Sequence, residues 1–183
     1  MGTGSIIAIV VGVLLVIIII SFISISNKIN RFNIKIDEAE SGIDVALTKR
    51  YDVLTKMMDV VKSYKKYEQE TIFEVINLRK GMTLNEMNEE NRKMSSNLAK
   101  INALAENYPE LKSSENFNTL QLAIVDVEEH LQAARRMYNS NVSQLNQLIV
   151  TFPSSIVAGM KGTQKRAFFE ADAEKKEDVK IDV

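Results

Sequence analysis

The sequence contains no cysteine and only one histidine, His130, among its 183 residues. A disulfide framework, a zinc–thiolate site and a cysteine nucleophile all need thiols, so all three are excluded. A site that needs two imidazole groups is excluded as well. We therefore expect no metal and no cofactor, and few groups are available for catalysis.

Glycine and proline are also scarce, with seven and two residues respectively. The sequence has no glycine-rich phosphate loop and no glycine-flanked nucleophile, which are signatures of nucleotide binding and of acyl transfer. Basic and acidic residues nearly balance, at 23 and 24, which argues against a general nucleic-acid binder. We predict that the protein is not an enzyme, has no catalytic residues and does not bind nucleic acid.

One long hydrophobic run contrasts with the charged remainder of the chain. Residues 6–25 carry no charge and would span about 30 Å as a helix, the thickness of the hydrocarbon core of a bilayer. A cleavable secretory signal, the main alternative, would start with basic residues and have a shorter apolar stretch. We predict a transmembrane helix over residues 6–25, with its anchor residues including Ile6, Val11, Leu15, Ile20 and Ile25.

The flanks of this run predict its orientation. Lys28, Arg31 and Lys35 follow the run, whereas residues 1–5 contain no basic side chain. Because positively charged flanks tend to stay in the cytoplasm, we expect residues 1–5 outside the cell and the rest of the chain in the cytoplasm. We therefore expect a protein that crosses its membrane once.

Beyond the run, apolar residues recur at spacings of three and four, which is typical of helices that pack through one face. The pattern predicts a first helix that continues from the membrane to about Arg79, a second over residues 84–108, a third over residues 117–152, and a short fourth helix capped by Ser154 or Ser155.

Thr83 and Glu86 have the spacing of a capping box, which marks the start of the second helix. The prediction for the fold is all-α: a transmembrane helix that continues into a long antiparallel bundle of three to four helices over residues 26–170. Eight of the thirteen residues 171–183 are charged, and we expect this segment to form a flexible tail.

The predicted first helix is much longer than the others, so its membrane-proximal stripe would lack a partner. Ile29, Phe32, Ile36 and Ala39 would face water, and Arg50 interrupts the same stripe with a charge that needs a partner. We therefore expect a homo-oligomer whose interface includes these five residues. Replacing Ile36 by aspartate would then reduce the native mass without unfolding the bundle.

Several segments resemble the LemA family. They are DEAESGIDVALTKRYDVL (37–54), VVKSYKKYEQETI (60–72), ENYPELKSSENFNTLQ (106–121), ARRMYNSNVSQLNQLIVTFPSSIVA (134–158) and FFEA (168–171). The resemblance implies a bacterial single-pass membrane protein with a cytoplasmic antiparallel helical bundle. It implies no reaction, because the family has no agreed biochemical activity. Glu40 stands where members of the family often carry tryptophan.

The remaining candidate site is weak. Asp126 and His130 are four residues apart on one helix face, and we interpret them as a surface pair rather than as metal ligands. The leading hypothesis is a membrane-anchored scaffold that self-associates and organises the membrane or recruits partner proteins. The alternative is an adaptor module whose bundle face or charged tail docks a membrane or cytoplasmic enzyme.

Overall fold

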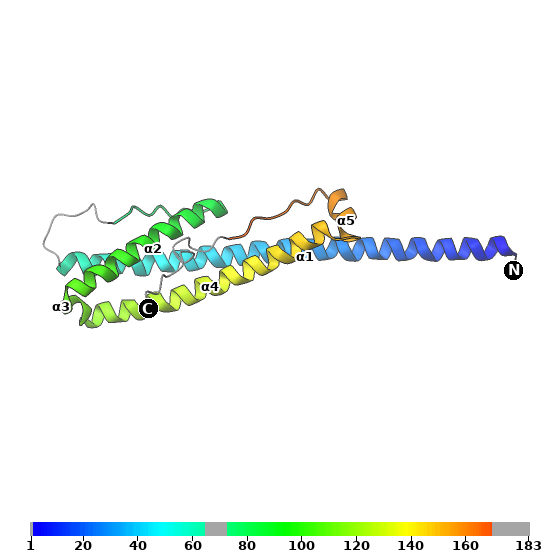
Figure 1. Cartoon of the computed structure of the whole chain (residues 1–183). Helices are drawn as coiled ribbons and strands as arrows, with labels where there is room; N and C mark the ends of the chain where they lie inside the picture. The colour runs from blue at the N-terminus through cyan, green and yellow to red at the C-terminus, as the bar shows by residue number, and fades with distance from the viewer. Residues whose placement is uncertain (1, 65–72, 170–183) are drawn as a thin grey trace, which may run out of the picture. The chain divides into compact units, whose positions relative to one another are not determined.

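The computed structural model describes residues 2–64 and 73–169 and is all-α over these residues. In chain order the helices are α1 (Thr3–Tyr64), α2 (Leu84–Asn107), α3 (Pro109–Lys112), α4 (Glu115–Val150) and α5 (Ser154–Met160) (Figure 1). A long N-terminal apolar helix packs against further helices as a bundle, which confirms the predicted fold class. The predicted tail, 171–183, lies outside the described residues.

The chain divides into two compact units, and α1 and α4 contribute to both. The first unit, called the membrane-proximal unit below, comprises residues 1–38 and 138–168. The second, called the distal unit, comprises residues 39–137 and 169–183. The apolar run and α5 belong to the first unit, and α2 and α3 belong to the second.

Apolar side chains from α1, α2, α3 and α4 form the core of the distal unit. Full burial of one such side chain stabilises a fold by about 1.5–3 kcal/mol. The core residues lie on the helices predicted from the sequence, except Leu111, which falls between the predicted second and third helices: Leu54, Met57, Val61, Met94, Ile101, Ala105, Leu111, Phe117 and Ile124.

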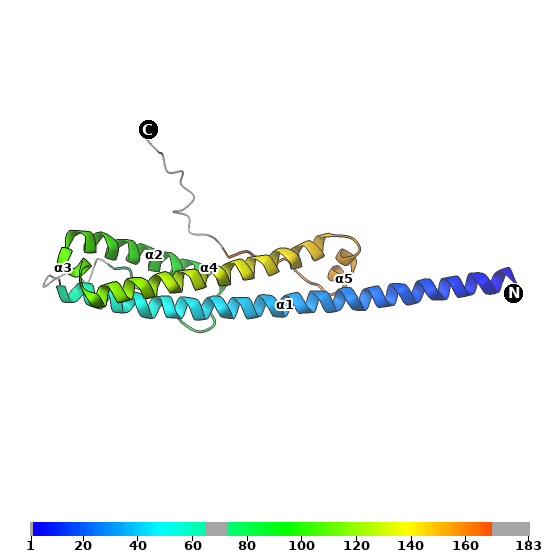
Figure 2. The same ribbon diagram turned by 90° about the horizontal axis from the view of Figure 1, so that it is seen from below.

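Contacts within the distal unit determine the directions of its helices. Gln121 of α4 donates a hydrogen bond to Asn102 of α2. Glu128 comes later on α4, and its partner Arg50 contacts Asn91, which comes earlier on α2. Thus α4 is antiparallel to α2, and the ribbon colours show α1 and α2 running in the same direction (Figure 2). The predicted antiparallel arrangement holds for α4 but not for α1 and α2.

The predicted end of the first helix near Arg79 is wrong, because α1 ends at Tyr64 and residues 73–80 are not helical. Three apolar side chains of this non-helical segment pack against the distal core, and backbone amides of the segment donate hydrogen bonds to side chains of α2. The first helix therefore does not continue through it, although its composition is compatible with a helix. The half-buried side chains are Phe73, Ile76 and Leu78.

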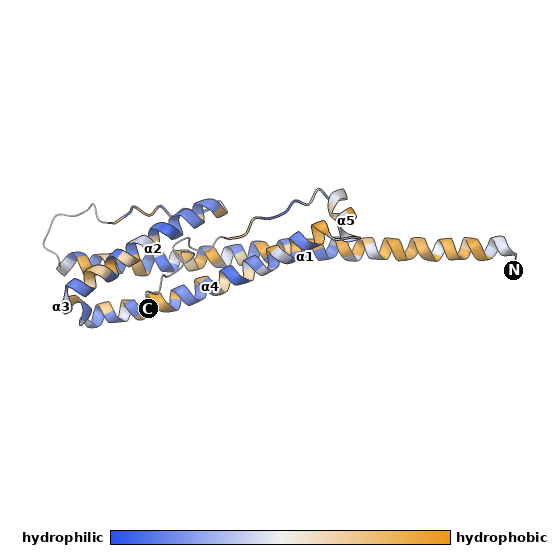
Figure 3. Cartoon of the chain, in the orientation of Figure 1, coloured by the Kyte–Doolittle hydropathy of each residue, from blue (hydrophilic) through white to orange (hydrophobic). Residues whose placement is uncertain are grey.

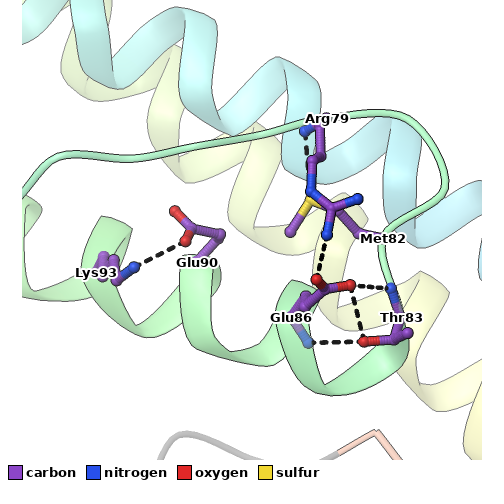
Figure 4. A network of polar contacts seen from close by, with 6 residues as sticks. All are labelled: Arg79, Met82, Thr83, Glu86, Glu90 and Lys93. Carbon is purple, nitrogen blue, oxygen red and sulfur yellow. Dashed lines mark hydrogen bonds and ion pairs between the residues drawn. The ribbon is translucent and has the colours of Figure 1, made fainter.

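The start of α2 is the predicted capping box (Figure 4). Glu86 Oε2 accepts hydrogen bonds from the Thr83 amide at 2.7 Å and the Thr83 hydroxyl at 2.9 Å, while the Glu86 amide donates to Thr83 Oγ1. Arg79 also pairs with Glu86. The hydrogen bonds from Thr83, followed by the Arg79 charge, lower the pKa of Glu86.

The later connections differ from the prediction in detail. The stretch between the predicted second and third helices contains the short helix α3, and α4 begins at Glu115. Ser154 is the first residue of α5 rather than its cap, since Pro153 occupies the cap position. The Ser154 hydroxyl instead donates to the Thr151 carbonyl at 2.9 Å.

Candidate functional site

The predicted anchor residues lie on the N-terminal part of α1, within the membrane-proximal unit. Ile6, Val11, Leu15 and Ile20 are at least half exposed, and Ile25 is half-buried. Figure 3 shows this part of α1 as a continuous apolar stretch. Among the described residues, this is the one helix that is long and apolar enough to cross a membrane by length and composition.

The three basic residues predicted to set the orientation are exposed on α1. The Lys35 ammonium lies 5.8 Å from the centre of the Phe32 ring, a cation–π distance. Lys28 and Arg31 belong to the same membrane-proximal unit and follow directly on the apolar run.

The expectation that the stripe of α1 lacks cover is wrong. Ile29 and Ile36 have no exposed surface, Ala39 is 4% exposed, and Phe32 is half-buried. The chain itself covers these residues, so their apolar character does not require a second copy. That they contact another copy stays a prediction, but it no longer follows from exposure of these side chains to water.

The C-terminal part of α4 and the chain after it cover Ile29 and Ile36 in the membrane-proximal unit. The Asn141 side chain donates to the Lys35 carbonyl at 3.3 Å, and the Arg166 guanidinium lies 3.0 Å from the Asp37 carboxylate. The buried apolar residues of this return segment are Tyr138, Val142, Leu145, Val157 and Ala158. Helix lengths alone suggested an uncovered stripe because they do not show where the C-terminal part of α4 and the chain after it pack.

Arg50 lies at the centre of a buried polar cluster in the distal unit. Its side chain is 3% exposed and pairs with Glu128 of α4 at 2.5 Å. Its Nη1 donates to the Asn91 carbonyl at 3.0 Å and to Asn91 Oδ1 at 2.5 Å, and its Nη2 donates to Ser95 Oγ at 3.1 Å. Arg50 thus joins α1, α2 and α4, and its partner is a carboxylate of the same chain.

A groove of about 930 Å³ runs beside this cluster between α2 and α4. Its apolar wall includes Leu98, Ile124 and Val125, and its polar wall includes Glu128 and Arg136. Charged side chains of both signs and apolar side chains therefore line the groove together. Such a lining suits an amphipathic peptide segment better than a small anion or a small cation.

The predicted surface pair also lines this groove. His130 Nε2 lies 3.6 Å from Asp126 Oδ1, and both side chains are mostly exposed, which fits a helix-surface pair. Within the described parts of the chain, no group of three histidine, aspartate or glutamate residues is placed to hold a metal ion.

A second polar cluster, which the sequence did not predict, holds residues 73–80 on α2. Asn97 has no exposed surface, and its side chain accepts from the Glu74 amide at 2.8 Å and donates to the Glu74 carbonyl at 2.9 Å. Glu90 accepts from the Asn77 amide at 2.7 Å and from Lys93 at 2.8 Å. These side chains satisfy backbone groups that a β-ladder or a helix would otherwise satisfy.

The charges around this cluster reinforce it. Hydrogen bonds from Ser96 and then from Lys100 lower the pKa of Glu74, and hydrogen bonds to Glu90 and then to Glu89 raise the pKa of Lys93. The available sequence signal was the seven-residue spacing of Glu90 and Asn97, which places both on one face of α2. It could be interpreted only once residues 73–80 were known to be non-helical.

Asn146 binds a non-helical backbone in the same way in the membrane-proximal unit. Its side chain accepts from the Arg166 amide and donates to the Arg166 carbonyl, both at 2.9 Å. In each unit, therefore, one helical asparagine binds both backbone groups of a residue outside the helices.

Replacing Asn97 by leucine should detach residues 73–80 from α2. The Glu74 amide and carbonyl would lose their partners, at a cost of about 1–3 kcal/mol in the free energy of unfolding. Amide hydrogen exchange should become fast at Glu74 while α4 stays protected. The control is Asn102→Leu on the exposed part of the same helix, and unchanged exchange at Glu74 in the Asn97 variant would contradict the prediction.

Comparisons with known proteins fit this arrangement. The model of the LemA family matches residues 39–183. The chain belongs to the LemA family. A curated relative, Protein LemA of Metamycoplasma hominis, is 29% identical over 163 residues, an alignment that covers 86% of this chain and 74% of the relative.

The LemA family match begins at Ala39, the first residue of the distal unit. It therefore includes Arg50, Asn91, Asn97 and Glu128, which form the two polar clusters. The apolar run lies before the matched range, so its interpretation rests on this chain's own length and composition.

Proposed function

We propose that this LemA-family protein is a non-enzymatic scaffold anchored in the bacterial cell membrane by one helix, which recruits partner proteins through its bundle. The main observation that supports this proposal is that the apolar run and the bundle share one continuous helix, α1. No part of the most apolar stretch is buried within the chain. An exposed apolar run of this length is unfavourable in water and favourable in lipid.

The distribution of charge supports a cytoplasmic bundle and an external N-terminus. The membrane-proximal unit carries six basic and two acidic side chains, a formal charge of +4, whereas the whole chain carries −1. The distal unit therefore carries −5. Basic residues next to a spanning helix favour the cytoplasmic side, so this asymmetry supports the same orientation as Lys28, Arg31 and Lys35.

The groove between α2 and α4 supports recruitment of a partner and equally the alternative role as an adaptor for an enzyme. It presents apolar and charged side chains together, as surfaces that bind peptide segments do. A non-enzymatic role is supported by the Arg50 cluster, whose charged groups pair with one another inside the protein. Self-association remains a separate prediction.

The topology can be tested directly because the chain has no cysteine. Single-cysteine variants Gly2→Cys and Gln164→Cys, both at exposed positions, should behave oppositely toward a membrane-impermeant maleimide. In intact cells the first should react, and the second should react only after lysis. The reverse result would overturn the orientation, and loss of both variants from the membrane fraction would overturn the anchor.

Recruitment can be tested with two matched charge insertions on α4. Val125 lines the groove and Leu122 does not, and both are more than half exposed. Val125→Arg should remove crosslinked partners that wild type and Leu122→Arg both retain. If the three crosslinking profiles are identical, the groove does not recruit the partners.

A further inference from the structure

Among the residues that the structure describes, an exposed apolar face lies on and just before α5. Phe152, Ile156 and Met160 are 82%, 57% and 73% exposed, whereas Val157 and Ala158 are at most 5% exposed. Ile156 and Met160 are four residues apart, which places them on the same side of the helix. Hence α5 packs one face against its own unit and presents the other, strongly apolar face outward.

The position of this face relative to α1 is fixed by Lys161, the residue after α5. Its ammonium donates to the Ser26 hydroxyl at 2.9 Å and to the Asn30 side-chain oxygen at 2.7 Å. Ser26 directly follows the apolar run, and Figures 1 and 2 both show α5 beside this part of α1. The exposed apolar face therefore lies at the level where α1 leaves its apolar stretch.

The charges nearby complement a phospholipid surface. Lys28, Arg31 and Lys165 are exposed in the same unit. Between residues 139 and 169 the chain has no aspartate or glutamate, and before Asp37 it has none either. An exposed apolar face combined with exposed basic residues in the same unit fits the pattern of segments that lie in the interface of an anionic membrane.

We infer that α5 is a second membrane contact: Phe152, Ile156 and Met160 insert at the boundary between headgroups and acyl chains, and the basic residues face anionic headgroups. A helix this short would bind lipid weakly by itself. The covalent link to α1 raises its effective concentration at the surface, so a weak contact becomes occupied. The inference rests on the proposed function, because it requires that α1 crosses the same bilayer.

The absence of tryptophan gives a direct test. The full chain carrying Ile156→Trp is reconstituted in bilayers that contain phosphatidylglycerol, with and without bromine on the upper acyl carbons. We expect blue-shifted emission that loses most of its intensity with brominated lipid. Leu122→Trp, at an exposed distal position, should show water-like emission without quenching.

A third variant separates the two proposals. Leu14→Trp, within the apolar run, should be quenched whether or not α5 touches lipid. If Leu14→Trp is quenched and Ile156→Trp is not, the α5 contact is overturned and the span stands. If Leu14→Trp is also unquenched, the span itself fails.

Two further outcomes are informative. Blue-shifted emission from Ile156→Trp without bromine quenching would mean that protein, such as a second copy, covers this face, and would overturn the lipid contact. Quenching should weaken in bilayers of phosphatidylcholine alone. Equal quenching in both bilayers would overturn the role assigned to anionic headgroups.

Discussion

Replacing Ile36 by aspartate should destabilise the folded chain by about 4 kcal/mol or more. Ile36 has no exposed surface, so the variant must bury a carboxylate without a prepared partner and lose the burial of an isoleucine side chain. The measurement is chemical unfolding of the full chain in detergent, followed by helical circular dichroism.

The matched control for this prediction is Ile34→Asp. Ile34 is the same residue type two positions earlier on α1, and it is 58% exposed. It should unfold close to wild type. If instead Ile36→Asp unfolds like wild type and only its native mass falls, the stripe is an interface between copies, as the sequence alone suggested.

Replacing Glu128 by glutamine should cost about 3 kcal/mol of the free energy of unfolding. The change keeps the shape of the side chain but leaves the Arg50 guanidinium, 3% exposed, without its carboxylate. Removal of one partner from a buried ion pair is usually worth about 3–5 kcal/mol. The lower figure applies because the Glu128 side chain is 31% exposed and water reaches its site.

A double-variant cycle isolates the pair. Arg50→Met removes the buried charge, so Glu128→Gln should cost much less in that background than in wild type. Glu129→Gln, at the exposed neighbouring position, should have almost no effect. Additive costs for the Arg50 and Glu128 variants would show that the two residues stabilise the fold independently.

The sequence also indicated that Arg50 is buried and needs a partner, but not which residue pairs with it. A charge within an apolar stripe signals a buried position, and either a carboxylate of the same chain or one from another copy would satisfy it. Glu128 is 78 residues later, on a helix whose register relative to α1 is fixed only by packing of the whole core. The choice between these partners is therefore a tertiary property.

Features that depend on neighbouring residues could be predicted from the sequence by itself. The anchor run follows from composition, the helical stripes follow from spacings of three and four, and the capping box of Thr83 and Glu86 closes within one turn. The Asp126 and His130 pair is local in the same sense. In each case the interacting groups are at most four residues apart or belong to one helix, so chain geometry alone brings them together.

Only the tertiary structure decided which surfaces are covered and where α1 ends. Residues 73–80 are compatible with a helix by composition, but contacts with the distal core and with Asn97 favour a non-helical path. Ile29 and Ile36 looked exposed because the residues that bury them, on α4 and beyond, are more than 100 positions away in the sequence. Local spacing carries no information about such distant segments, since the free energy that pairs them arises when the whole core excludes water.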